Sequence, residues 1–341
     1  MPSPIAVLIS DIHFNLNTLP LASASLRQAV AEAERLRVPL VIAGDLHDTK
    51  AILRGECVSE IISILKDRKI SIYVLIGNHD KIHEKSEAHA LEFLTPYVNI
   101  VKAPVYMNRL GWMIPYQHDP DILLKILDSI RSSSVYPIQH EVIMHQGISG
   151  AFMGEYVIDK TSLPAEAYRD LKVVSGHYHR HQMIKVPNGS FEYIGTPYTI
   201  SFAEANDGPK GFQILMNDWS MRQVETNLRK HVILETTIDL LPYMGLGPDK
   251  DDLLWLKITG FQSELDKMDK KAIGIGLLGH SNFKLDLIPT DGGNLELEAP
   301  SSSFTVQEIL DKLIDNMAEP EEHKSYLKVL YQEVMDETTS R

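Results

Sequence analysis

The chain has 341 residues, of which 44% are hydrophobic, and a formal charge of −13 at neutral pH. This length can bury one large core with a smaller appended one, and the hydrophobic fraction is typical of a folded globular protein. Cys57 is the only cysteine, which excludes an intrachain disulfide, and the acidic charge disfavours strong nucleic-acid binding by the isolated chain. The N-terminal M-P-S-P lacks the charged start of a signal peptide, and the apolar run at 5–9 is too short to span a membrane, so we expect a cytoplasmic protein.

The first half of the chain alternates strand-like and helix-like patterns, as an α/β layered domain does. Continuous apolar runs at 5–9, 40–43, 72–76, 142–144 and 173–174 predict strands buried on both faces of a parallel or mixed sheet. Apolar residues at helical spacing predict helices after Thr18, before the third strand, and over 81–97 and 121–133. Further strands are predicted within 190–225, with a hairpin turn at Asn217 and Asp218.

Each of the five apolar runs is followed by a short polar motif. The motifs read S-D-I-H (10–13), G-D-L-H-D (44–48), G-N-H-D (77–80), H-Q-G (145–147) and G-H-Y-H (176–179). Ligands bind beyond the carboxyl ends of strands in such sheets, so we expect all five motifs at one edge. Carboxylate, amide and imidazole groups suit Mn, Fe or Zn, and an Asp can bridge two cations that clamp a phosphate. Asp and Asn are also common turn residues, but turns alone do not explain five such motifs together.

A second unit is predicted to begin near Arg229. Strand patterns at 231–240, 253–258 and 283–288 accompany a helix-like stretch at 264–272, which indicates a small α+β module. We therefore predict three parts: a large α/β domain at 1–227, the small α+β module at 228–298 and a helical segment at 299–341.

The last segment carries an apolar stripe. A capping box at 305–308 precedes a helical pattern, and a second helix with its own apolar face follows Pro320. The stripe comprises Val306, Ile309, Leu310, Leu313, Ile314 and Met317. Two helices cannot bury such a stripe alone, so it packs either on the body of this chain or on a partner.

The ordered set D-x-H, G-D-x-x-D, G-N-H-D, H and G-H-x-H resembles the calcineurin-like metallophosphoesterase superfamily, over about residues 5–180. A further stretch, Y-I-G-T-P-Y-T-I-S-F-A-E (193–204) with K-G (210–211), is similar to the segment that closes the catalytic domain of SbcD-type DNA nucleases. The resemblance implies a layered α/β sheet sandwich flanked by helices, a small α+β capping domain and C-terminal helices. The chain length and the tail resemble those of a phage-type member that works in recombination, replication and double-strand-break repair.

The resemblance also implies which residues hold metal. A first divalent ion would be surrounded by Asp11, His13, Asp45 and His179. A second would be surrounded by Asp45, Asn78, His145 and His177, with Asp45 as the bridge. His79 and Asp80 form the implied catalytic set: His79 would protonate or stabilise the leaving oxygen, while Asp80 and Asp48 would orient imidazoles or metal waters. Asp48 could equally be a loop cap. The implied cofactor is a pair of divalent ions, foremost Mn²⁺, with Mg²⁺, Fe²⁺ or Zn²⁺ as alternatives.

The implied function is that of a Mn²⁺-dependent DNA exo- and endonuclease subunit, which hydrolyses phosphodiester bonds together with an SbcC-type, SMC-like ATPase. The apolar stripe would dock on the root of the ATPase coiled coil. Two copies of the chain would pair as a homodimer, with Leu91, Phe93 and Leu94 as candidate contacts, although core packing explains these residues equally well. The expected setting is the cytoplasm of a bacterial or phage-infected cell, without a membrane. A small-molecule phosphodiesterase or phosphoprotein phosphatase of the same superfamily is the alternative, because it would use the same ligands.

Overall fold

The computed structural model describes residues 2–241 except 84, 133–139, 155 and 156, together with 249, 251–269, 273, 283–290 and 324. The chain divides into a unit Met1–Ile288 and a unit Pro289–Arg341. The apolar stripe at 306–317, the capping box and the second tail helix at 327–334 lie outside the described residues. Within the described part of the chain, no helix is long and apolar enough to cross a bilayer.

The first sheet is mixed and has the order β12-β11-β1-β2-β3-β4. Its parallel strands are β1 (Pro4–Ile9), β2 (Leu40–Ile42), β3 (Ile72–Leu75) and β4 (Asn99–Val101). A hairpin of β11 (Gly211–Met216) and β12 (Met221–Glu225) adds antiparallel strands beside β1. The predicted strands and the hairpin turn at Asn217 and Asp218 are therefore confirmed.

The second sheet is also mixed and has the order β5-β6-β7-β8-β10-β9. Its strands are β5 (Val105–Met107), β6 (Gly111–Ile114), β7 (Glu141–His145), β8 (Lys172–Gly176), β9 (Met183–Val186) and β10 (Gly189–Tyr193). The pairs β6–β7, β7–β8 and β8–β10 are parallel. Among the described residues, 3-10 helices lie in connections between strands of both sheets: η1 (Ala90–Leu94) between β3 and β4, η2 (Ala165–Tyr168) between β7 and β8, and η3 (Phe202–Glu204) between β10 and β11.

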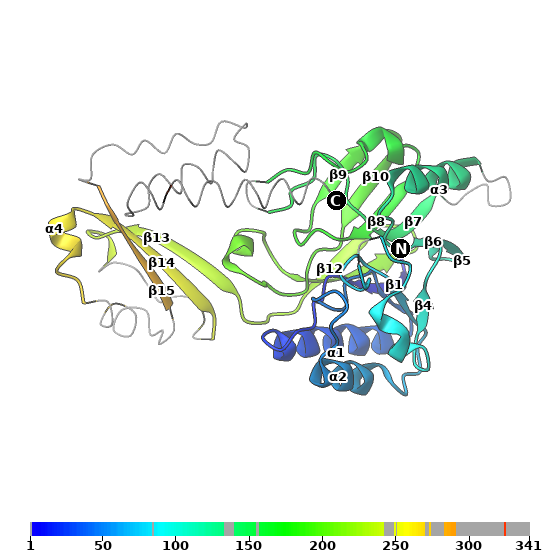
Figure 1. Cartoon of the computed structure of the whole chain (residues 1–341), viewed down its shortest axis with the longest axis horizontal. Coiled ribbons are helices and arrows are strands. Elements are labelled where there is room, and N and C mark those ends of the chain that lie inside the picture. Colours follow the sequence, from blue (N-terminus) through cyan, green and yellow to red (C-terminus); the bar gives the residue numbers. More distant parts are fainter. Residues whose placement is uncertain are drawn as a thin grey trace. The chain divides into compact units, whose positions relative to one another are not determined.

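Strand β1 shows why these strands read as continuous apolar runs. Its alternate residues Ala6 and Leu8 belong to a cluster shared with Ile143 of the second sheet. Val7 and Ile9 point the other way, into a cluster with helices α1 (Leu19–Leu36) and α2 (Gly55–Leu65), which lie side by side on that face (Figure 1). Since both faces are buried, neither tolerates a polar residue. Helix α3 (Pro120–Ser132) packs with strands of the second sheet in the same manner. The result is the predicted α/β sandwich flanked by helices.

The small α+β unit is a three-stranded sheet of β13 (His231–Thr237), β14 (Leu253–Gly260) and β15 (Phe283–Pro289). It has its own core, in which Leu254, Leu256 and Ile258 line one face of β14. In the described part of the predicted helical stretch at 264–272, which ends at residue 269, the structure has α4 (Gln262–Leu265), which begins two residues earlier than predicted.

The predicted helix at 81–97 is wrong. In its described residues, that segment begins with an isolated bridge between Lys81 and His89, and η1 is the one helical element. The physical reason is that Leu91 and Leu94, three residues apart, both enter the core within one short turn, and the Ala90 N–H donates to the Asp80 carbonyl at 2.8 Å. Both leucines have no exposed surface, so they are core residues and cannot be dimer contacts.

Candidate metal centre

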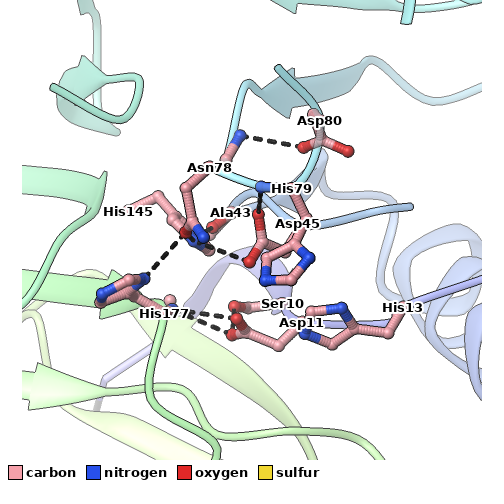
Figure 2. Close-up of polar contacts among 12 residues, drawn as sticks. Ser10, Asp11, His13, Ala43, Asp45, Asn78, His79, Asp80, His145 and His177 are labelled. Atoms are coloured by element: carbon pink, nitrogen blue, oxygen red, sulfur yellow. Dashed lines mark hydrogen bonds and ion pairs between the residues drawn. The ribbon is translucent and has the colours of Figure 1, made fainter. Parts of the chain in front are cut away.

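The five polar motifs meet where the parallel strands of the two sheets end. The motifs that follow β1, β2 and β3 come from the first sheet, and those at the ends of β7 and β8 come from the second. Figure 2 shows the side chains from both sheets converging on one space. Among the described residues, three groups of side chains each bring three ligand atoms within 4.8 Å of one another. We call two of them the first position (Asp11, His13, His179) and the second position (Asp45, Asn78, His145, His177), where Asn78 is added on its contacts. The third group, His13, Asp48 and His79, shares His13 with the first position.

In the first position, two imidazole nitrogens face each other. Nε2 of His13 lies 3.2 Å from Nε2 of His179. The Asp11 carboxylate beside them accepts hydrogen bonds from the His177 N–H, at 3.1 Å to each oxygen, and from the Ser10 hydroxyl. Nδ1 of His13 lies 3.4 Å from an Asp48 carboxylate oxygen.

In the second position, one amide oxygen lies between two rings. Oδ1 of Asn78 is 3.0 Å from Nε2 of His145 and 2.9 Å from Nδ1 of His177. The other side of His145 is fixed by the backbone, because its Nδ1 lies 2.8 Å from the Ala43 carbonyl, which can only accept. Nε2 of His145 is also 3.2 Å from Oδ2 of Asp45.

Asp45 occupies the middle of the site. Its Oδ1 accepts a hydrogen bond from the His79 N–H at 2.8 Å, while Oδ2 faces His145 (Figure 2). Burial opposes ionisation of this carboxyl, but the charge of His145 outweighs burial and lowers the pKa of Asp45 well below its usual range. The described geometry groups Asp45 with the second position, and its bridging contact to the first remains a prediction.

The backbone at the site is unusual. Asp11, His13, Asp45 and His177 all have positive φ angles, of 52°, 50°, 50° and 93°. Such conformations cost free energy in residues other than glycine and cluster at functional sites. Glycine is required at Gly77, where a Cβ would come within 2.1 Å of the Asp45 carboxylate. These strained turns direct the side chains into the centre.

The two implied catalytic residues differ in burial: His79 is partly buried and Asp80 is fully buried. The His79 ring is partly buried, and its Nδ1 contacts the Asp48 carbonyl, which leaves Nε2 as its other polar atom. Asp80 is fully buried and uses both oxygens on backbone: Oδ1 accepts from the His47 N–H at 3.1 Å and Oδ2 from the Gly77 N–H at 2.9 Å. Burial and the nearby Asp45 charge raise the pKa of Asp80. These contacts join the loops after β2 and β3, so they support a positioning role for Asp80 more than a chemical one.

Sequence reasoning gave no role to Glu204, which the structure places against a candidate ligand. Oε1 of Glu204 lies 2.7 Å from Nδ1 of His179. Burial would raise the pKa of Glu204, but the hydrogen bond from His179 and the charge of Lys210 lower it to about 2, so the carboxylate is ionised. Glu204 is the last residue of the stretch 193–204, which resembles SbcD-type nucleases. That resemblance is the sequence feature that could have indicated a role for it.

The donor set fits a pair of divalent cations. Carboxylate, amide and imidazole atoms are the ligands that Mn²⁺, Fe²⁺ and Zn²⁺ share. The electrostatics agree, because burial would lower the pKa values of His13 and His145, yet the neighbouring carboxylates raise them, that of His145 to about 9. The carboxylates of the centre therefore stabilise a nearby positive charge. A bound cation supplies that charge when these imidazoles bind it in their neutral form.

Comparison with known proteins identifies the family. Residues 6–181, which hold all five motifs, match the model of the calcineurin-like phosphoesterase family. This chain is a calcineurin-like phosphoesterase. As a member of that family it is an enzyme, a metal-dependent hydrolase of phosphate esters.

Two curated relatives of this phosphoesterase are named for an exonuclease and for the repair of DNA double-strand breaks. Exonuclease subunit 1 of Enterobacteria phage T4 is 27% identical over 248 residues, which cover 66% of this chain and 68% of that protein. The DNA double-strand break repair protein Mre11 of Methanocaldococcus jannaschii is 25% identical over 174 residues, which cover 47% of this chain and 46% of that protein. A solved structure, phosphopantetheinyl hydrolase (PptH) from Mycobacterium tuberculosis, matches 65% of this chain and 96% of its own at 14% identity and a TM-score of 0.33, too low to support any argument.

Proposed function

We propose that this phosphoesterase is a phage-type, Mn²⁺-dependent DNA exo- and endonuclease subunit that acts in recombination, replication and double-strand-break processing. The observation that carries the proposal is the length of the match to the phage T4 exonuclease subunit. That alignment of 248 residues is longer than the family segment 6–181, so the similarity extends beyond the metal-binding core that all phosphoesterases share. A small-molecule phosphodiesterase or phosphatase gains no such support.

The proposed chemistry assigns a task to each group. Two bound cations would lower the pKa of a water and screen the negative charge of the phosphate. Asp11, Asp45 and the four histidines of the two positions hold their atoms toward that space, and Asn78 adds its amide oxygen. The backbone N–H of His79 donates to Asp45, and its ring Nδ1 contacts the Asp48 carbonyl. These contacts fix the residue, so its Nε2 can carry a proton to the leaving oxygen.

DNA must approach an acidic chain. The two cations would add four positive charges where the ligand carboxylates lie, and Lys81 and Arg180 follow two of the motifs directly. Lys102 lies 2.5 Å from a Glu92 carboxylate oxygen and is partly neutralised by it. A partner that supplies basic surface would complete the binding of DNA.

The proposed partner is an SbcC-type, SMC-like ATPase, held by the apolar stripe at 306–317, and the proposed assembly contains two copies of this chain. Burial of four or five large aliphatic side chains contributes roughly 1.5–3 kcal/mol each before ordering costs. Deletion of 301–341 should then abolish association with the ATPase while leaving the melting temperature unchanged. A lower melting temperature with ATPase binding intact would mean that the stripe packs on this chain. Sedimentation across a wide concentration range tests the dimer.

The decisive test of the substrate compares three compounds with and without Mn²⁺: linear duplex DNA, a chromogenic phosphodiester and a phosphopeptide. We expect Mn²⁺-dependent cleavage of DNA at the highest kcat/KM, and no cleavage by an Asp45→Ala variant purified in parallel, which controls for contaminating nucleases. Higher kcat/KM on the small phosphodiester or the phosphopeptide would contradict the proposal and support the alternative.

A further inference from the structure

Glu204 is buried between a candidate metal ligand and the backbone. It lies at the end of η3 and is 8% exposed. Oε1 accepts from Nδ1 of His179 at 2.7 Å, and Oε2 accepts from the Ile200 N–H at 3.0 Å. Both carboxylate oxygens are thus engaged, and the one that faces His179 is held in place by the other.

Lys210 contacts the backbone of the same histidine. Its ammonium group donates to the His179 carbonyl and to Oδ2 of Asp207, each at 2.9 Å, and lies 3.4 Å from Oε2 of Glu204. A buried ammonium is costly unless it is paired, and Lys210, also 8% exposed, is paired with two carboxylates. His179 is therefore fixed at its backbone by Lys210 and at its ring by Glu204.

The contact with Glu204 also decides which nitrogen of His179 is available. An ionised carboxylate can only accept, so Nδ1 carries the hydrogen and Nε2 presents its lone pair. That Nε2 is the atom that faces Nε2 of His13 at 3.2 Å. In metal sites, such a carboxylate orients the ring and raises the basicity of the ligating nitrogen.

We propose that Glu204 is a positioning residue for His179 and that it sets the metal affinity of the first position. His179 needs such a partner because packing does not fix its ring: its side chain is 31% exposed, whereas that of His145 has no exposed surface. Without Glu204, the ring is free to leave the rotamer that faces His13. The proposal concerns metal binding by the chain and is independent of the substrate.

A purely structural role is the competing explanation. The contacts among Glu204, Asp207 and Lys210 also tie the segment 200–210 to the sandwich, and loss of that tie would destabilise the fold as a whole. The two explanations differ in their readout. Loss of positioning weakens the binding of one metal ion selectively. Loss of a structural tie lowers the stability of the fold and weakens the binding of both ions equally.

The test is a Mn²⁺ titration of the full-length protein, followed by the EPR signal of free Mn²⁺, with thermal unfolding measured alongside. For Glu204→Ala we expect the Kd of one ion to rise about 10–100-fold, while the other ion keeps its wild-type affinity. Glu204→Gln should lose less, because its amide oxygen can still accept from Nδ1 of His179. Glu192→Ala is the matched control: it removes another Glu–His contact, 3.6 Å long, to His181, which is no candidate ligand, and it should bind like the wild type.

Wild-type affinity for both ions in Glu204→Ala would overturn the proposal, as would an equal loss at both ions or a similar loss in the Glu192→Ala control. If Glu204→Ala fails to fold, Glu204→Gln decides alone. A loss of several fold confined to one ion then supports the proposal, and unchanged affinities overturn it.

Discussion

The two metal positions differ in what holds their histidines. In the second position, His145 is fully buried and its Nδ1 faces a backbone carbonyl, and His177 stacks near the rings of Tyr116 and Tyr178 at 5.9 and 4.8 Å between centroids. In the first position, His13 and His179 face the carboxylates of Asp48 and Glu204. Each position has one buried histidine, His13 or His145, and one partly buried histidine, His179 or His177. The difference lies in the contacts: backbone and aromatic rings hold the second position, whereas carboxylate side chains that a single substitution can remove hold the first.

The largest effect is expected where the two positions meet. Asp45→Ala should remove the bridging oxygen, abolish tight binding of at least one ion, and reduce hydrolysis by more than the roughly 10²–10³-fold that loss of one transition-state contact costs. Elemental analysis after gel filtration, together with kcat/KM, measures both. If this variant keeps two tightly bound ions, Asp45 does not join the positions and the comparison fails.

His79 is expected to affect the chemistry of the site without affecting either position. His79→Ala should lower kcat by about 10²–10⁴-fold, the usual contribution of a positioned acid, while both ions stay bound. Measurement of metal content together with kcat separates the effect on chemistry from the effect on metal binding. Loss of both ions in this variant would show that His79 supports the ligands and that its proposed role is wrong.

A pair of alanine variants separates core from surface support. His145→Ala should lower the free energy of unfolding of the metal-free protein by about 1–3 kcal/mol, because the buried Ala43 carbonyl loses its partner. His179→Ala should change it less, since its ring is partly exposed. Urea unfolding in the presence of a chelator measures both values. Equal losses would remove the distinction between the two positions.

The smallest effect is expected for Asp48, whose side chain is 39% exposed. Asp48→Ala should weaken the first position by at most about 10-fold, because water can replace part of its contact with His13. A Mn²⁺ titration measures the change. A larger loss than in Glu204→Ala would place the main support of the first position on Asp48.

The sequence predicted the large sandwich well for a physical reason. Strands such as β1 and β7 are buried on both faces, so their apolar runs are continuous, and the polar motifs begin where burial ends. Residues 81–97 were mispredicted because Leu91 and Leu94 follow a helical spacing that one short turn also satisfies.

Residues of the site were predictable where a motif is local and were missed where a contact is tertiary. Asp11 and His13, or His177 and His179, lie within one motif and could be recognised together. Glu204 is 25 residues from His179, and Asp80 binds backbone N–H groups of two loops, at His47 and Gly77. Neither contact is encoded by spacing, since both arise only when the sheets assemble.

The central claim is that the two positions form one dinuclear centre, and EPR of the protein loaded with Mn²⁺ tests it most directly. Two ions about 3.5–4 Å apart, joined by a carboxylate, give an exchange-coupled spectrum. We predict two ions per chain with that coupling, and its loss in Asp45→Ala. A single ion per chain, or two ions with the spectrum of isolated Mn²⁺, would contradict the claim.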